Sequence, residues 1–313
     1  MLTNPFFVVN PHSANGRTLR QWEELRAELR RALGEVHFEL TRGAMHAAAI
    51  TAAAIEAGAD LVVAVGGDGT LNEVLNGYFR VGRQPAGGAA LGYLPSGTGS
   101  DFARTMGLYG LSVAQQVERL ASGTVRLLDC GQVRFTGKGA GGEPLETSRL
   151  FLNESSLGFS AETVNNVNRA SKRFGGKASF FIGVLRTLAR LRNPLLQVTV
   201  DGKQVYEGPT LLVAVANGKY FGGSMMIAPM ADVQDGEFDV VVISAMTRLT
   251  VLRKIGKIYR GEHLAEPEVH VHRGREVRIA STGEEVLLEM DGEQPGRLAA
   301  DFSISRHTVP FLA

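Results

Sequence analysis

The stretch that decides the fold is residues 61–73, LVVAVGGDGTLNE. Residues 61–65 form an unbroken apolar run with the length and β-branching of a strand that is buried on both faces. The glycines that follow permit a tight turn, because glycine adopts backbone conformations that other residues avoid. The last four residues, TLNE, have the spacing of a capping box and predict the start of a helix. Strand, glycine turn and helix N-terminus in this order favour a bound phosphate.

One carboxylate, Asp68, lies inside this turn. It would repel a polyphosphate unless a divalent cation lay between them, so the stretch predicts a metal–nucleotide site. The alternative is an ordinary turn aspartate, which is common beside glycine. Asn72 and Glu73 are expected to serve the site and the helix cap together, although the cap alone would explain Glu73.

Composition limits the class of protein. The chain has 313 residues, 44% hydrophobic and 21% charged, which is typical of a globular protein with two domains. A net charge of +1 favours neither nucleic acid nor membrane as a partner of the whole protein. The single cysteine, Cys130, fits a reducing compartment. The first residues lack the pattern of a signal peptide, and a cytoplasmic location is expected.

Outward from residues 61–73, strands alternate with helices along residues 1–127. Strand patterns at residues 5–10, 36–40, 61–65 and 89–94 predict an open parallel sheet with helices on both faces, an α/β fold. Their loops, residues 10–17, 41–43, 66–70 and 95–101, are expected to meet at the carboxyl edge of that sheet, where such folds bind ligands.

The pattern changes near residue 124. Short strand-like runs at hairpin spacing predict an antiparallel β-sandwich domain over residues 128–297. Two helical stretches, about 177–192 and 248–260, interrupt the strands. The tail, residues 298–313, is expected to pack back on the first domain.

Six ordered motifs resemble those of the diacylglycerol kinase catalytic-domain family, bacterial soluble lipid kinase type, in the superfamily that includes NAD kinases. They are Asn-Pro-x-Ser at 10–13, a threonine at 41, Gly-Gly-Asp-Gly-Thr at 66–70, PSGTGSDFAR at 95–104, Asp-Gly-x-x-Asp at 235–239 and Asp-Gly-Glu at 291–293. Ser100 departs from the family, which usually has asparagine there. The resemblance implies an ATP-dependent lipid kinase with an NAD-kinase-like first domain, a β-sandwich domain and an active site in the cleft.

By the same resemblance, several residues bind ATP: Asn10, Pro11, Ser13, Thr41, Gly66, Gly67, Asp68, Gly69, Thr70, Asn72, Glu73, Thr98 and Asp101. Ser13 and Thr41 are equally explained as loop caps, and Asp101 as a helix cap. Serine caps a helix as well as asparagine does, so the fold is expected to tolerate Ser100.

The catalytic residues implied are Glu293, Asp291 and Asp68. Transfer of a γ-phosphoryl group to a hydroxyl calls for a proton acceptor, and Glu293 is assigned that role. Asp291 is expected to bind nucleotide or to share the role. Without the other motifs, an ordinary Asp-Gly hairpin turn with a solvated glutamate would explain these residues.

The resemblance also implies a structural Mg²⁺ in the loop 232–237, held by a side chain and backbone carbonyls, with Asp235, Asp232 and Glu237 around it. Hard cations prefer such oxygen ligands. The alternative is an acidic turn without an ion.

Residues 248–260 have the pattern of an amphipathic helix. Arg253, Lys254, Lys257 and Arg260 fall on the arc opposite Val251, Leu252, Ile255, Ile258 and Tyr259. Such a helix can lie on anionic lipid at the inner face of a membrane, or pack on its domain with the basic face solvated. Residues 177–192, with Phe180, Phe181, Val184, Leu185 and Leu188, are a second candidate wall for a lipid acceptor or else core. The sequence leaves open whether the protein forms a homodimer.

The leading hypothesis is transfer of the γ-phosphoryl group of ATP to a lipid hydroxyl, on diacylglycerol or a related glycerolipid. The alternatives are a sphingoid-base or ceramide kinase, an NAD kinase, or a catalytically silent regulator that binds nucleotide or lipid. The motifs at 10–13 and 95–104 favour the lipid kinase over the NAD kinase. Retention of Asp68, Asp291 and Glu293 favours an active enzyme.

Overall fold

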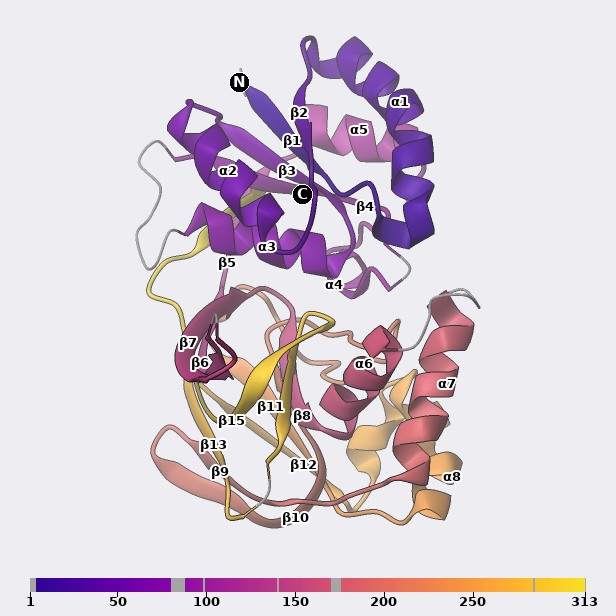
Figure 1. The fold of residues 1–313 in the computed structure, drawn as a ribbon, viewed down its shortest axis with the longest axis vertical. Coiled ribbons are helices and arrows are strands. Elements are labelled where there is room, and N and C mark those ends of the chain that lie inside the picture. Colours follow the sequence, from indigo (N-terminus) through magenta and orange to yellow (C-terminus); the bar gives the residue numbers. More distant parts are fainter. Residues whose placement is uncertain are drawn as a thin grey trace. The chain divides into compact units, whose positions relative to one another are not determined.

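The structure, a computed structural model, describes residues 4–79, 88–97, 99–139, 141–169, 176–283 and 285–312. The chain forms two compact units, Met1–Leu128 with His307–Ala313, and Asp129–Arg306 (Figure 1). The expected division assigned residues 298–313 to the first unit. Residues 298–306 instead belong to the second, because Glu293–Ile304 is one continuous strand of its sheet.

The first unit is built on a sheet in the order β2-β1-β3-β4-β16-β5. Neighbouring strands are parallel except β16 and β5, so the predicted parallel sheet is confirmed. The strands are β1 (Pro5–Val9), β2 (His37–Leu40), β3 (Leu61–Gly66), β4 (Ala90–Pro95), β5 (Val125–Leu128) and β16 (Val309–Leu312). The chain's end thus returns to the first sheet.

Helices cover both faces of this sheet (Figure 1). They are α1 (Ser13–Leu33), α2 (His46–Glu56), α3 (Asp68–Tyr78), α4 (Asp101–Thr105) and α5 (Val113–Ser122). Trp22 of α1 and Leu120 of α5 share one core with Val63 of β3. On the other face α2 and α3 pack closely, since a Cβ at Gly77 would lie 2.3 Å from the carbonyl oxygen of Ala48. The apolar run of β3 is buried on both sides as its sequence predicts.

The second unit is antiparallel at every strand pair that the structure describes. Its strands are β6 (Gly131–Lys138), β7 (Pro144–Phe151), β8 (Glu154–Gly158), β9 (Leu195–Val200), β10 (Lys203–Ala216), β11 (Phe238–Ser244), β12 (Val269–Gly274), β13 (Glu276–Ser281), β14 (Leu287–Met290) and β15 (Glu293–Ile304). The long β10 pairs with β9 through its first half and with β8 and β11 through its second. The predicted sandwich therefore closes on itself through β9 and β10, like a barrel.

The core of the second unit lies inside this closed sheet. Phe151 stacks on Phe238 with ring centroids 5.7 Å apart and meets the edge of Phe302 at 6.3 Å. Helices α6 (Phe159–Arg169), α7 (Gly176–Ala189) and α8 (Arg248–Ile258), with a short 3-10 helix (Glu262–Ala265), complete the unit. Within the described parts of the chain, no helix has both the length and the apolar character that a membrane span requires.

Candidate nucleotide and catalytic sites

Three loops meet at the carboxyl edge of the first sheet, as the strand order predicts. The Nδ2 of Asn10, after β1, donates to the Oγ1 of Thr70 at 3.0 Å. The backbone N–H of Ser96, after β4, donates to the carbonyl of Gly66 at 2.8 Å. The Ser96 hydroxyl also lies 2.7 Å from the Oγ1 of Thr18 in α1. Direct hydrogen bonds therefore join the loops that follow β1, β3 and β4.

The two glycine turns approach each other so closely that side chains cannot stand between them. A Cβ at Gly97 would lie 2.7 Å from the Cα of Gly67, and one at Gly66 would lie 2.5 Å from the Oγ1 of Thr70. Both contacts are too short for a real Cβ, so glycine is required for close packing rather than for an unusual φ. No side chain of residues 66, 67 or 97 covers the backbone here, which suits a phosphate-binding turn.

Asp68 is the first residue of α3, and its carboxylate lies at the N-terminus of α4. It accepts hydrogen bonds from the backbone N–H groups of Asp101 at 3.0 Å and Phe102 at 3.3 Å, and from the hydroxyl of Tyr93 at 3.3 Å. Burial, and then the charge of Asp101, raise the pKa of Asp68 from 3.8 to about 6, against the opposing effect of these hydrogen bonds. Asp68 is thus a cap as well as a candidate site residue.

The donor set around Asp68 fits a nucleotide-bound Mg²⁺. Asp68 is half-buried and Asp101 is buried, their charges repel each other, and a cation would relieve that repulsion. Among the described residues, no group of three or more His, Cys, Asp or Glu side chains is placed to hold a metal ion. This pattern suits Mg²⁺ that arrives on ATP, since Mg²⁺ usually takes one or two carboxylates and otherwise phosphate and water.

The expected capping box at the start of α3 is wrong. The helix begins at Asp68, two residues before Thr70, so Thr70 already lies in its first turn. Glu73 instead reaches the neighbouring helix, where its Oε2 accepts a hydrogen bond from the backbone N–H of Ala47 at 3.1 Å. Glu73 therefore fastens the start of α2 to α3.

Ser13 and Pro11 lie in the turn that follows β1. The Ser13 hydroxyl donates to the carbonyl of Asn10 at 2.9 Å, hydrogen-bonds with the Oγ1 of Thr18, and lies 3.4 Å from the hydroxyl of Ser96. The structure thus shows the loop-capping role of Ser13 that the sequence allows, at the place where the three loops meet.

The other polar residues predicted to bind ATP are mostly buried. Thr41 directly follows β2, and its N–H donates to the carbonyl of Val9 at 2.8 Å. Asn72 is buried in α3, and its Oδ1 accepts from the Nδ2 of Asn76 at 3.2 Å. Thr98 lies outside the described residues.

Ser100 does not act as the predicted cap. It precedes α4 with a φ of +51°, in the left-handed region where asparagine is better tolerated than serine. Its hydroxyl donates to the carbonyl of Gly97 at 3.0 Å, while Asp68 supplies the acceptor for the N–H groups of α4.

In the second unit, the predicted Asp-Gly-Glu motif forms the turn between β14 and β15. Asp291 and Gly292 have φ angles of +47° and +86°. The Asp291 carboxylate points inward and accepts from the N–H of Glu154 at 3.1 Å. The N–H of Gly292 donates to the Oε1 of Glu289 at 2.8 Å. The turn is thus fastened from beneath by buried groups.

Glu293 begins β15, and its side chain is 40% exposed. Its Oε2 lies 3.3 Å from the NH1 of Arg149 on β7, a residue that the sequence analysis missed. The guanidinium therefore fixes the direction of the carboxylate. Of the two acids in the motif, Glu293 is the more exposed, so it is the one that a substrate hydroxyl could approach.

Two further buried acids, Glu154 and Glu289, were also missed. Ser156 donates to Glu289, and burial followed by the charge of Glu289 raises the pKa of Glu154 well above its usual value. Burial therefore favours the neutral form of Glu154 over its charged form. The signal in the sequence was the polar run that starts at Asn153 within an otherwise apolar strand.

The acids of the loop 232–237 lie within reach of an arginine. Asp232 and Asp235 accept from the N–H groups of Gln234 and Glu237, each at 3.1 Å. Arg273 pairs with Asp235 and lies 3.4 Å from Glu237. Among the described residues the three carboxylates alone do not form a cluster of metal ligands, and the expected Mg²⁺, held by a side chain and backbone carbonyls, stays a prediction.

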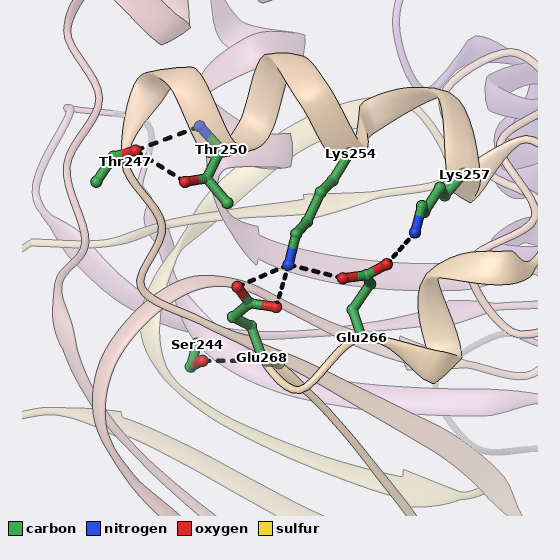
Figure 2. A network of polar contacts seen from close by, with 7 residues as sticks. All are labelled: Ser244, Thr247, Thr250, Lys254, Lys257, Glu266 and Glu268. Atoms are coloured by element: carbon green, nitrogen blue, oxygen red, sulfur yellow. Dashed lines mark hydrogen bonds and ion pairs between the residues drawn. The ribbon is translucent and has the colours of Figure 1, made fainter.

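The basic arc of α8 is largely neutralised (Figure 2). Lys254 Nζ lies 2.7 Å from Glu266 and 2.6 Å from Glu268, and Lys257 also pairs with Glu266. Beyond the end of the helix, Arg260 pairs with its neighbour Glu262 at 2.7 Å. Of the four cations predicted to face solvent or lipid, three therefore already have acidic partners.

The buried face of α8 also differs from the apolar arc that the sequence predicted. Val251 and Ile258 are buried, but Leu252 and Tyr259 are 52% and 44% exposed. In α7, Val184 and Leu188 are buried and Leu185 is exposed, while the side chains of Phe180 and Phe181 lie outside the described set.

Comparisons with known proteins agree with the motifs. Residues 4–133 match the model of the diacylglycerol kinase catalytic domain, and residues 154–312 match the YegS C-terminal NAD kinase beta sandwich-like domain. A diacylglycerol kinase of Bacillus subtilis (strain 168) is 28% identical over 249 residues, 79% of this chain and 76% of the relative. One from Staphylococcus carnosus (strain TM300) is 27% identical over 299 residues, 94% and 90% of the two chains.

A solved structure of a Bacillus anthracis diacylglycerol kinase matches the fold with a TM-score of 0.71 and 20% identity, covering 99% of this chain and 97% of the other. The sandwich-domain model alone matches more than half of the 313 residues. The diacylglycerol kinase catalytic-domain model spans the three joined loops. The chain therefore belongs to the family of the YegS C-terminal NAD kinase beta sandwich-like domain, with a diacylglycerol kinase catalytic domain before it.

Proposed function

We propose that the protein transfers the γ-phosphoryl group of ATP to a hydroxyl of diacylglycerol or a closely related glycerolipid. The observation that carries this proposal is the hydrogen-bonded convergence of the loops after β1, β3 and β4 around Asp68, within a diacylglycerol kinase catalytic domain. Relatives named diacylglycerol kinase support the substrate class.

The first unit binds ATP in this proposal. The glycine turns at 66–69 and 97 would bind the phosphates through backbone N–H groups, and Asn10 and Ser96 hold the loops together. Asp68 and Asp101 are the acids that would hold Mg²⁺ on the nucleotide. When bound, Mg²⁺ would neutralise charge on the phosphates.

The second unit supplies the proton acceptor. Glu293 accepts the proton of the lipid hydroxyl as the phosphoryl group is transferred, and Arg149 keeps its carboxylate in one direction. Asp291 is buried and bonded to the backbone of Glu154, so it holds the turn instead of sharing the proton transfer.

The acceptor lipid resides in a bilayer, so the enzyme contacts a membrane surface peripherally. The predicted contact through Arg253, Lys254, Lys257 and Arg260 is reduced to Arg253, because the other three have acidic partners. Cytoplasmic location remains the expectation from sequence.

A lipid-panel assay tests the proposal. Radiolabelled γ-phosphate from ATP is offered to diacylglycerol, monoacylglycerol, a sphingoid base, ceramide and NAD. We expect label in diacylglycerol or a related glycerolipid, and a loss of 10²- to 10⁴-fold for Glu293→Gln. Label in NAD alone would contradict the substrate class, and equal transfer by wild type and Glu293→Gln would contradict the role of Glu293.

A further inference from the structure

Helix α8 is held against its unit in one orientation. Val251 and Ile258 are buried in the core, and the Oγ1 of Thr247 caps the first turn by accepting from the N–H of Thr250 at 3.2 Å. Lys254 reaches down between Glu266 and Glu268, as Figure 2 shows. Core contacts on one side and ion pairs on the flank therefore prevent the helix from rotating about its axis.

This orientation leaves an apolar surface on the opposite side of α8. Leu249 is 55% exposed and Leu252 is 52% exposed. With about 100° per residue, Leu249, Leu252 and Arg253 fall within an arc of about 100° that faces away from Val251 and Ile258. Single exposed leucines are common, but several on one helix face together with arginine are typical of an interfacial helix.

The apolar surface continues past the end of the helix. Tyr259 is 44% exposed and Met230 is 76% exposed. Met230 follows Pro229, which packs against Gly261 so closely that a Cβ there would lie 2.7 Å from the Cγ of Pro229. The surface formed by Leu249, Leu252, Tyr259 and Met230 is called here the α8 outer surface.

The charges beside this surface indicate what kind of partner binds to it. Arg248 and Arg253 are exposed, and neither has an ion pair among the described residues. The nearby glutamates 266 and 268 are already bound to lysines. Two unpaired guanidinium groups beside exposed leucines match a surface with anionic headgroups over an apolar interior. A second copy of the same surface would bring arginines toward arginines.

We propose that the α8 outer surface, with Arg248 and Arg253, seats this protein on an anionic lipid bilayer. The leucines and Met230 enter the boundary between headgroups and acyl chains, and the arginines contact lipid phosphates. This proposal rests on the proposed function, because a bilayer-resident acceptor is what gives the enzyme a reason to bind membrane.

Vesicle sedimentation tests the proposal. Wild type, Leu249→Gln/Leu252→Gln and Arg248→Gln/Arg253→Gln are mixed with vesicles of phosphatidylcholine containing phosphatidylglycerol, or of phosphatidylcholine alone. Leu145→Gln, at a similarly exposed leucine of β7, is the matched control. We expect each double variant to partition at least about tenfold more weakly into anionic vesicles, and the control to behave as wild type. Unchanged partitioning of both double variants would overturn the proposal.

A second experiment tests whether the α8 outer surface contacts the lipid directly. Cys130 is the single cysteine and is buried, so Leu252→Cys can be labelled with an environment-sensitive fluorophore. We expect a blue shift with anionic vesicles, and no shift for Leu145→Cys. A change of oligomeric state in the double variants with unchanged vesicle binding would assign the surface to a second copy instead.

Kinase assays separate this proposal from the proposed function. With short-chain diacylglycerol dispersed below its aggregation limit, the double variants should phosphorylate as wild type, and with vesicle-bound diacylglycerol they should be slower. Loss of activity on both substrates would contradict a role confined to membrane docking. Absence of lipid kinase activity in wild type would refute the proposed function while leaving the vesicle result to stand on its own.

Discussion

The Asp68 carboxylate, at the start of α3, accepts the backbone N–H of Asp101, at the start of α4, at 3.0 Å. This hydrogen bond ties the two glycine turns of the first unit to each other. It also places the half-buried acid Asp68 beside the buried acid Asp101, and the pKa of Asp68 rises to about 6. The arrangement is unfavourable for a protein without a cation and suitable for one that binds Mg²⁺ with ATP.

We predict that Asp68→Asn stabilises the nucleotide-free protein and abolishes kinase activity. The folded pKa of about 6 exceeds the unfolded value of 3.8, so ionisation of Asp68 disfavours folding. Stability from this group is present below pH 3.8 and is lost as pH rises through 6, by on the order of 1–3 kcal/mol. An asparagine avoids the loss, because its side chain stays neutral while its oxygen can still accept an N–H.

Thermal melts in EDTA at pH 5 and pH 8 check this prediction. Asp68→Asn should melt higher than wild type at pH 8 and show a smaller difference at pH 5. Glu118→Gln, at an exposed position of α5, is the control and should leave both melts unchanged. A lower melting temperature for Asp68→Asn at pH 8 would contradict the assigned cost of the buried charge.

We predict that Glu154→Gln is tolerated and that Glu154→Ala is not. Glu154 is buried, and burial raises its pKa and disfavours its charged form, so glutamine supplies a neutral group of the same size. Alanine leaves a cavity beneath the Asp291 turn and should cost about 2–4 kcal/mol. Denaturant unfolding at pH 7 measures both effects.

The pH dependence of Glu154 has a defined sign. Its folded pKa lies well above the usual 4.5, so wild-type stability falls as pH rises above 4.5 toward the folded value. Glu154→Gln should flatten this loss as the pH is raised above 4.5. An equal slope in both proteins would contradict the raised pKa of Glu154.

Arg149 is predicted to act by positioning Glu293. Because the guanidinium lies 3.3 Å from the carboxylate, Arg149→Ala removes an ion pair that orients Glu293. We expect kcat to fall about tenfold with little change in KM for ATP, and Arg149→Lys to restore part of the loss. The pH–rate profile should shift as well, which a purely structural effect would not produce. Arg134→Ala, at an exposed arginine of the adjacent strand β6, is the control.

The first unit was more predictable than the second because its pattern is local. The run 61–65, its glycines and the strands on either side specify a parallel sheet whose loops must share an edge. Glu73 was misassigned because a capping box and a contact to a neighbouring helix use the same residue type. Only the packing of α2 on α3 distinguishes them.

The contacts of the second unit depend on residues far apart in the chain. Arg149 meets Glu293 across 144 residues, and Glu154 meets Asp291 across 137. No periodicity encodes such pairs. On α8, helical spacing identified an amphipathic helix but not its rotation, which Glu266 and Glu268 determine by binding the lysines.

The last prediction concerns Ser100, which departs from the family's usual asparagine. Its φ of +51° disfavours a residue with a Cβ, and asparagine tolerates this region better than serine or alanine. Ser100→Asn should therefore raise the free energy of unfolding by up to about 1 kcal/mol. Ser100→Ala should lower it by about 1 kcal/mol, since the hydrogen bond to the Gly97 carbonyl is lost. Denaturant midpoints for the three proteins should fall in the order Asn, Ser, Ala, and a midpoint for Ser100→Asn below that of Ser100→Ala would show that side-chain volume at this buried position outweighs backbone strain.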